Sequence, residues 1–156
     1  MAKRKKIIPE EGDLVAIKLS DGKFGLAQIA GVKKDDSGFV VHTIWAFFDA
    51  HSDYLTDLEQ YIGKPGYLET PFLVCGMDYE ELEKGKWPVL GTKPVAFTNA
   101  SLDETAVAKL QKEEIAGAYL LEMYLGIVPW NMYKDPEYLD KRLLPGYNRP
   151  ENVLLK

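Results

Sequence analysis

The sequence predicts an α+β fold dominated by a curled antiparallel sheet or partial barrel, which starts with a three-strand meander and carries one long helix and several short helices. Three observations predict it. Residues 13–32 form two apolar segments around an Asp-Gly turn, residues 39–48 are apolar on both faces, and residues 101–125 carry a helical apolar stripe. Consecutive antiparallel strands of this kind are typical of a small curled sheet.

The first element is a β-hairpin. Apolar residues alternate along residues 13–19, and Asp21-Gly22 follows, a favoured pair for a two-residue type I′ turn with positive φ at both central residues. This turn predicts the pairs Leu19 with Phe24, Ile17 with Leu26, and Val15 with Gln28. The opposite face then carries further small and apolar residues, which allows it to be covered as well: Leu14, Ala16, Gly25, Ala27 and Ile29.

Weaker signals follow the third strand at residues 39–48. Ser52 or Asp53 is placed to cap a short helix that runs to Tyr61. The remaining segments before residue 100 are assigned by composition: a buried strand at 71–77, a brief acidic helix or loop at 78–84, and strand candidates at 87–90 and 94–98, split by Gly91.

The longest helix is predicted from Ser101 to about Leu125. Ser101 and Glu104 fit a capping box, Gly117 is a candidate kink, and Gly126 is placed to end the helix. In the tail we expect a one-turn helix at 136–142 and a terminal strand at 153–155.

Length and charge set limits on the class of protein. We expect residues 1–156 to form a single domain, in which the basic segment 1–8 is a flexible tail rather than a signal peptide. The net charge of −5 argues against a nucleic-acid partner, and no apolar run is long enough to span a membrane. Cys75 is the single cysteine, so no intrachain disulfide can form, which favours a cytoplasmic location.

Motifs for catalysis, metals and cofactors are missing from the sequence. It contains no glycine-rich phosphate-binding pattern, and the nitrogen and sulfur ligands are limited to His42, His51 and Cys75, which do not have metal-site spacing. Cys75 lies in an apolar strand and is interpreted as a buried thiol. We therefore predict no catalytic, cofactor-binding or metal-binding residue.

Two segments are candidates for partner binding. The first is the acidic segment, which would present charge and apolar anchors to a basic protein; it comprises Asp78, Tyr79, Glu80, Glu81 and Glu83, with Leu82 between them. An exposed helix face explains the same pattern. The second is the aromatic tail, whose residues either anchor a partner or pin the tail onto the core: Trp130, Tyr133, Tyr138, Tyr147, Arg142 and Arg149.

The hairpin carries a family resemblance. Residues 12–19, Gly-Asp-Leu-Val-Ala-Ile-Lys-Leu, and residues 21–29, Asp-Gly-Lys-Phe-Gly-Leu-Ala-Gln-Ile, resemble the opening of the immunity protein 26 family. Leu-Pro-Gly at 144–146 and Arg-Pro-Glu-Asn-Val at 149–153 are similar to the end of that family. The resemblance implies a mostly β fold and a role in bacterial polymorphic toxin systems. It implies no functional residue at any position of this chain.

The expected function is therefore that of a cytoplasmic immunity protein, which binds and neutralises a cognate protein toxin by occlusion and without catalysis; a basic toxin fits the acidic balance of the chain. Two alternatives stay open. One is a small hydrolase of the phosphotriesterase type that uses a carboxylate with His42 or His51. The other is a ligand-binding β-domain with an aromatic pocket between the sheet and the long helix.

Overall fold

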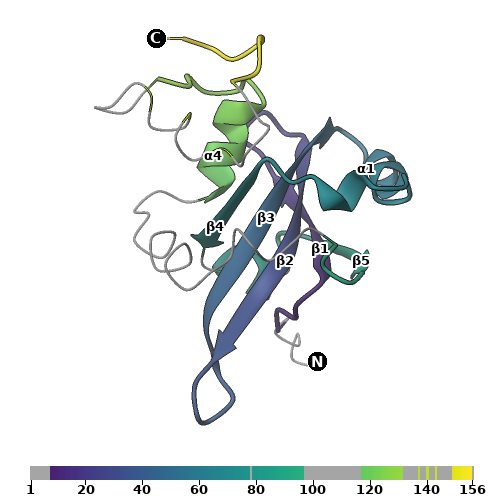
Figure 1. Cartoon of the computed structure of the whole chain (residues 1–156), viewed down its shortest axis with the longest axis vertical. Helices are drawn as coiled ribbons and strands as arrows, with labels where there is room; N and C mark the ends of the chain where they lie inside the picture. Colours follow the sequence, from purple (N-terminus) through teal and green to yellow (C-terminus); the bar gives the residue numbers. More distant parts are fainter. Residues whose placement is uncertain are drawn as a thin grey trace, which may run out of the picture.

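The computed structural model describes residues 8–77, 79–96, 117–131, 137, 140, 143 and 149–155 (Figure 1). Its described part contains one antiparallel sheet of five strands in the order β4-β3-β2-β1-β5. The strands are β1 (Asp13–Lys18), β2 (Phe24–Lys34), β3 (Val40–Ser52), β4 (Leu73–Met77) and β5 (Val89–Thr92). The helices are α1 (Leu55–Ile62), the 3-10 turn η1 (Tyr67–Glu69), α2 (Glu80–Glu83) and α4 (Gly117–Tyr124).

The predicted three-strand meander is confirmed, because β1 pairs with β2 and β2 pairs with β3, both antiparallel. β2 and β3 are the longest strands, with 11 and 13 residues. Their hairpin extends well beyond the rest of the sheet (Figure 1). At its tip Phe39 is 71% exposed, and Val41 two residues further along is 55% exposed.

The predicted register of the first hairpin is wrong by one residue. Lys18 pairs with Phe24, and Ile17 pairs with Gly25. The turn is a three-residue loop: Gly22 donates its N–H to the Leu19 carbonyl, and the Leu19 N–H bonds to the Lys23 carbonyl. Gly22 has φ +87°, and no non-glycine residue in the described part has positive φ, so Asp21 does not adopt the type I′ conformation. A type I turn followed by a left-handed glycine is the usual three-residue hairpin loop.

The shifted register exchanges the faces of β2. Ala27 and Ile29 join Val15 and Ile17 in one core, whereas Leu26 belongs to the other. A slip of one residue has this effect because side chains alternate along a strand. Gly25 faces the first core, where a Cβ atom would lie 2.6 Å from Leu121 Cδ2 of α4.

Both faces of the sheet are covered, as the composition of the hairpin allows. On one face, α2, α4 and the segment around Trp130 pack on the first core, which includes Trp45, Phe47, Phe72, Leu82, Leu121 and Trp130. On the other face, α1 and η1 pack on Phe48, Ala46 and Leu26 through Leu58 and Leu68. Figure 1 shows α4 and α1 on opposite sides of the strands.

Several smaller predictions are corrected. The helix after β3 begins at Leu55 with Tyr54 as its N-cap, and the Ser52 hydroxyl accepts the Tyr54 N–H instead of capping the helix. β5 continues through Gly91, where the β1–β5 register shifts, so this glycine does not split two strands. Residues 94–96 are not in a strand.

The long helix is described only from Gly117 to Tyr124; residues 101–116 of the predicted helix lie outside the described residues. Gly126 follows it with φ +78°, in agreement with the predicted end. The predicted terminal strand is reduced to a single parallel bridge between Pro129 and Leu154. The predicted turn of helix at 136–142 falls largely outside the described residues. Among the described helices, none is long and apolar enough to cross a membrane.

Candidate functional site

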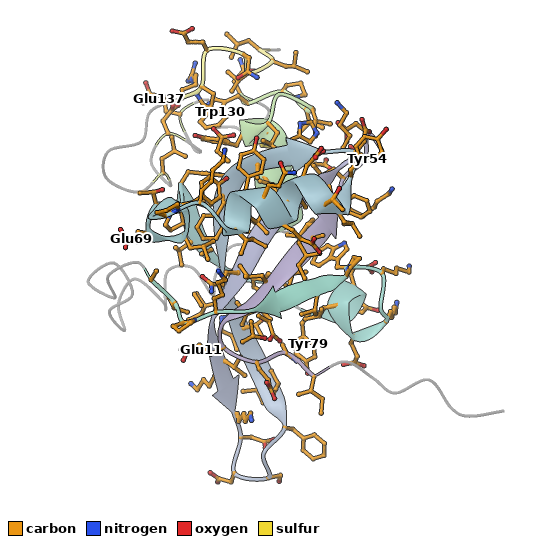
Figure 2. All side chains as sticks on the ribbon, turned by 90° about the vertical axis from the view of Figure 1, so that its right-hand side faces the viewer. Glu11, Tyr54, Glu69, Tyr79, Trp130 and Glu137 are labelled. Carbon is orange, nitrogen blue, oxygen red and sulfur yellow. The ribbon has the colours of Figure 1, made fainter. Side chains whose placement is uncertain are left out.

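The acidic segment predicted to bind a partner forms α2 and the residues before it. Glu80, Glu81 and Glu83 lie on this helix, while Asp78 falls outside the described residues. Leu82 is 0% exposed and belongs to the first core, so it is not available as an apolar anchor. Tyr79 is half-buried, lies beside β2 and β3 (Figure 2), and donates its hydroxyl to the Val40 carbonyl at 3.0 Å.

Two lysines reduce the negative charge of this segment. Lys84 Nζ lies 2.8 Å from Glu80 Oε1, and Lys86 Nζ lies 3.6 Å from Glu81 Oε2. The hydrogen bond from Lys84 and its charge lower the pKa of the Glu80 carboxyl. On the surface of α2, two of the glutamates of the acidic segment, Glu80 and Glu81, are therefore paired with lysines.

Apolar surface is found beside α2, where six residues line an open hollow of about 580 Å³: Lys18, Phe24, Glu81, Lys86, Trp87 and Pro88. We call it the α2 hollow. Trp87 is held edge-on against Trp45, with 5.9 Å between ring centroids, and Pro88 is fixed because its carbonyl accepts the Ala16 N–H. Lys18 Nζ lies 4.6 Å from the centre of the Phe24 ring. The hollow thus has aromatic and proline walls and a rim of charged groups.

Sequence reasoning found only Glu81 among the residues of this hollow. Lys18 and Phe24 come from the first hairpin, more than fifty positions before Trp87 and Pro88. They meet because β5 pairs with β1. No spacing in the sequence signals that pairing, although aromatic residues next to a charged segment are typical of protein interfaces.

The aromatic tail is attached to the core at Trp130, which is 1% exposed. Its indole N–H donates to Asp140 at 3.3 Å, and Asp140 also accepts two hydrogen bonds from Arg149, at 3.2 and 2.8 Å. The hydrogen bond from Arg149, opposed by burial and supported by Trp130, lowers the pKa of the Asp140 carboxyl. Trp130 therefore pins the tail; Tyr133, Tyr138, Arg142 and Tyr147 lie outside the described residues.

The two histidines and the cysteine lie at different positions of the sheet. His42 pairs with Lys33 near the protruding end of β3, and Cys75 on β4 lies opposite Trp45. His42 Nε2 is buried without a hydrogen-bond partner in the described part of the chain, and burial, followed by the charge of Lys33, lowers its pKa. The described residues contain no group of three or more His, Cys, Asp or Glu that could hold a metal ion.

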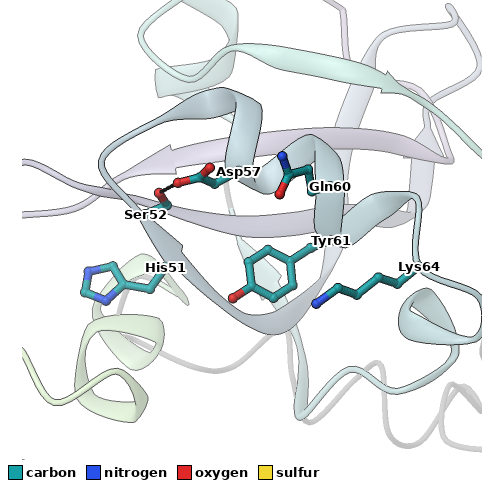
Figure 3. A pocket seen from close by; sticks show the side chains of 6 residues that line it. All are labelled: His51, Ser52, Asp57, Gln60, Tyr61 and Lys64. Carbon is teal, nitrogen blue, oxygen red and sulfur yellow. Dashed lines mark hydrogen bonds between the residues drawn. The ribbon is translucent and has the colours of Figure 1, made fainter.

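His51 takes part in a second, smaller pocket of about 200 Å³, which we call the α1 pocket (Figure 3). It lies where the end of β3 meets α1, and it is lined by His51, Ser52, Asp57, Gln60, Tyr61 and Lys64. His51 Nε2 lies 2.9 Å from Asp21 Oδ2, whereas Ser52 Oγ donates to Asp57 Oδ2 at 2.5 Å. Histidine and serine thus have separate carboxylate partners and do not form a nucleophile–base pair.

The residues that carry the family resemblance have identifiable structural roles. Gly12 has φ +96° and packs against the Lys93 carbonyl. Asp13 is buried and accepts hydrogen bonds from the Glu10 N–H at 3.0 Å and the Thr92 hydroxyl at 2.8 Å. Asp21 accepts the Lys23 N–H and His51, which together lower its pKa against the opposing effect of burial.

Comparison with protein families, with curated proteins and with solved structures found no match to this chain.

Proposed function

We propose that this chain is a binding protein that neutralises a cognate protein toxin by covering a site on it, without catalysis. The observation that carries the proposal is the α2 hollow, in which Phe24, Trp87 and Pro88 form apolar walls within a charged rim. Protein interfaces concentrate their binding energy in this arrangement, an aromatic pocket surrounded by polar groups.

The chemistry of the hollow favours binding over catalysis. Its ionisable residues are Lys18, Glu81 and Lys86, and the last two are paired with each other. Among the described residues, no histidine, cysteine or hydroxyl side chain lines it, so these residues offer apolar contact and charge pairing but no nucleophile.

Two features of the whole chain support a toxin as the partner. The hairpin at residues 12–29 resembles the immunity protein 26 family, whose members protect the producing cell from its own toxin. The net charge of −5 also favours association with a basic protein, because long-range attraction raises the rate of encounter. The paired charges of α2 add little to this attraction, so we assign the steering to the whole molecule.

Co-expression tests the proposal. The chain is produced together with the C-terminal domain of a toxin encoded beside its gene, and cell survival and co-purification are measured. We expect rescue and a one-to-one complex. A toxin that kills equally in the presence of the chain, with no complex formed, would reject the proposal.

Charge reversal at the rim tests the surface. We expect Glu81→Lys to weaken the complex by at least about tenfold. The change removes the carboxylate that is paired with Lys86 and places a positive charge on the rim, which is unfavourable toward a basic partner. Glu59→Lys on the exposed face of α1 is the matched control and should keep the affinity of the parent chain. If the Glu81→Lys variant still rescues the cells and binds with unchanged affinity, the toxin remains the partner but the α2 hollow is not part of the interface.

A further inference from the structure

The α1 pocket contains an arrangement of polar groups that the proposed function does not use. Asp57, Gln60, Tyr61 and Lys64 follow one another at intervals of three, one and three residues, which places them along one face of α1 and the turn after it. His51 and Ser52 at the end of β3 close the opposite side (Figure 3). Side chains from the end of β3, from α1 and from the turn after it thus line one small pocket.

The carboxylates near this pocket already have partners. Asp57 Oδ2 accepts the Ser52 hydroxyl, and Asp21 behind His51 accepts the His51 ring and the Lys23 N–H. These contacts hold the Ser52 and His51 side chains in place. They also satisfy the acceptors that would otherwise compete for the donors of α1.

The donors on α1 have no such partners. Among the described residues, the Lys64 ammonium forms no ion pair, and neither the Tyr61 hydroxyl nor the Gln60 amide forms a hydrogen bond. Lys64 Nζ instead lies 4.5 Å from the centre of the Tyr61 ring, which positions it next to the pocket. Figure 3 shows the Tyr61 hydroxyl and the Lys64 ammonium extending toward the side of the pocket where His51 lies.

We infer that the α1 pocket binds the carboxylate or phosphate group of a small molecule, with Lys64 and Tyr61 as its principal contacts. A free ammonium beside free hydroxyl and amide donors matches the acceptor oxygens of an anion. The volume of about 200 Å³ is below the range of about 300–1,000 Å³ typical of drug-sized ligands, so the ligand is a small metabolite or its anionic end. Asp57 lies two helical turns from Lys64 and directs the anion to the Lys64 end by repulsion.

Titration of the full chain with inorganic phosphate and, separately, with acetate tests this site at constant ionic strength. Amide chemical shifts of residues 57–64 are followed by NMR. We expect saturable shifts in this segment with at least one of the two anions, and the stronger one identifies the preferred group. Shifts that stay linear with concentration and match those produced by chloride would overturn the inference.

Two variants assign the contacts. Lys64→Met keeps most of the apolar stem of Lys64, and we expect it to lower the affinity for the preferred anion at least about fivefold. Tyr61→Phe keeps the ring, and we expect it to lower the same affinity about twofold. Lys34→Met, at an exposed position on the hairpin of β2 and β3, is the matched control and should bind as the parent does. If the parent and Lys64→Met bind the anion with equal affinity, and circular dichroism shows that both chains are folded, the site is rejected.

Discussion

The carboxylate of Glu122 accepts a hydrogen bond from the backbone N–H of Ser20 at 2.7 Å and so ties α4 to the turn of the first hairpin. The two residues are 102 positions apart, and Glu122 is only 7% exposed. The next residue toward the N-terminus, Leu121, lies over Gly25. A charged hydrogen bond and a close apolar contact therefore determine together where α4 sits on the sheet.

Replacement of Glu122 tests this connection. We expect Glu122→Leu to lower the free energy of unfolding by about 1–3 kcal/mol, because it removes a hydrogen bond to a charged group and leaves the Ser20 N–H without its acceptor. Glu122→Gln retains an acceptor and should cost less than half as much. Urea unfolding followed by fluorescence measures both, and equal losses in the two variants would contradict the role of the hydrogen bond.

Gly12 and Gly22 form a matched pair for backbone strain. Both have positive φ, +96° and +87°, but a Cβ atom on Gly12 would lie 2.5 Å from the Lys93 carbonyl oxygen, whereas Gly22 has open space. We expect Gly22→Ala to cost about 1–2 kcal/mol for the left-handed conformation alone. Gly12→Ala should cost about 2–4 kcal/mol, since displaced backbone adds to that strain. Equal losses of unfolding free energy would show that the contact with Lys93 is not important.

His42 should make stability depend on pH. Burial, and then the charge of Lys33, lower its pKa in the folded chain below the ordinary value of 6.5. As the pH falls from about 7.5 to about 5, the unfolded chain takes up the proton first, so the free energy of unfolding decreases. We expect His42→Gln to lose less stability over this interval than the parent, in urea unfolding at both pH values.

A second variant separates the two causes. Lys33→Gln removes the nearby charge but leaves His42 buried, so its loss of stability should fall between those of the parent and of His42→Gln. The same pH dependence in all three chains would show that His42 does not contribute to it.

Trp130 and Phe39 are aromatic residues with opposite environments. Trp130 is 1% exposed and joins the tail to the core, whereas Phe39 is 71% exposed at the tip of the β2–β3 hairpin. We expect Trp130→Ala to reduce the free energy of unfolding by about 3–5 kcal/mol. Phe39→Ala should change it by less than about 0.5 kcal/mol. Thermal unfolding by circular dichroism compares them, and a similar change in both would refute a pinning role for Trp130.

Local pattern was sufficient to predict the three-strand meander of the sheet. The alternation of Val15 and Ile17, the Asp21-Gly22 turn and the apolar third segment predicted a meander, which β1, β2 and β3 form. These features act between near neighbours in the chain, where turn chemistry and side-chain alternation are strong. The helix after β3 was also predicted, with small errors at its ends, and segment 78–84 was predicted as a brief acidic helix or loop, of which the structure has the helix Glu80–Glu83.

The register and the partners of each face depended on contacts between distant residues. The turn at Gly22 left the hairpin free to close in either of two ways, and packing against Leu121 accompanies the pairing in which Gly25 faces α4. Likewise, nothing in the acidic segment itself indicates that Leu82 enters the core. A helix of four residues has too short a pattern to show which side is buried.

The sequence by itself determined the antiparallel meander, the ordinary globular composition and the lack of catalytic motifs. Only the tertiary structure decided that Trp87 and Pro88 meet Lys18 and Phe24, and that Lys64 and Tyr61 face His51 across a pocket. The physical reason is that side chains far apart in the chain become neighbours through strand pairing and through helices packed on the sheet. Spacing along one chain does not record which of these distant surfaces come together.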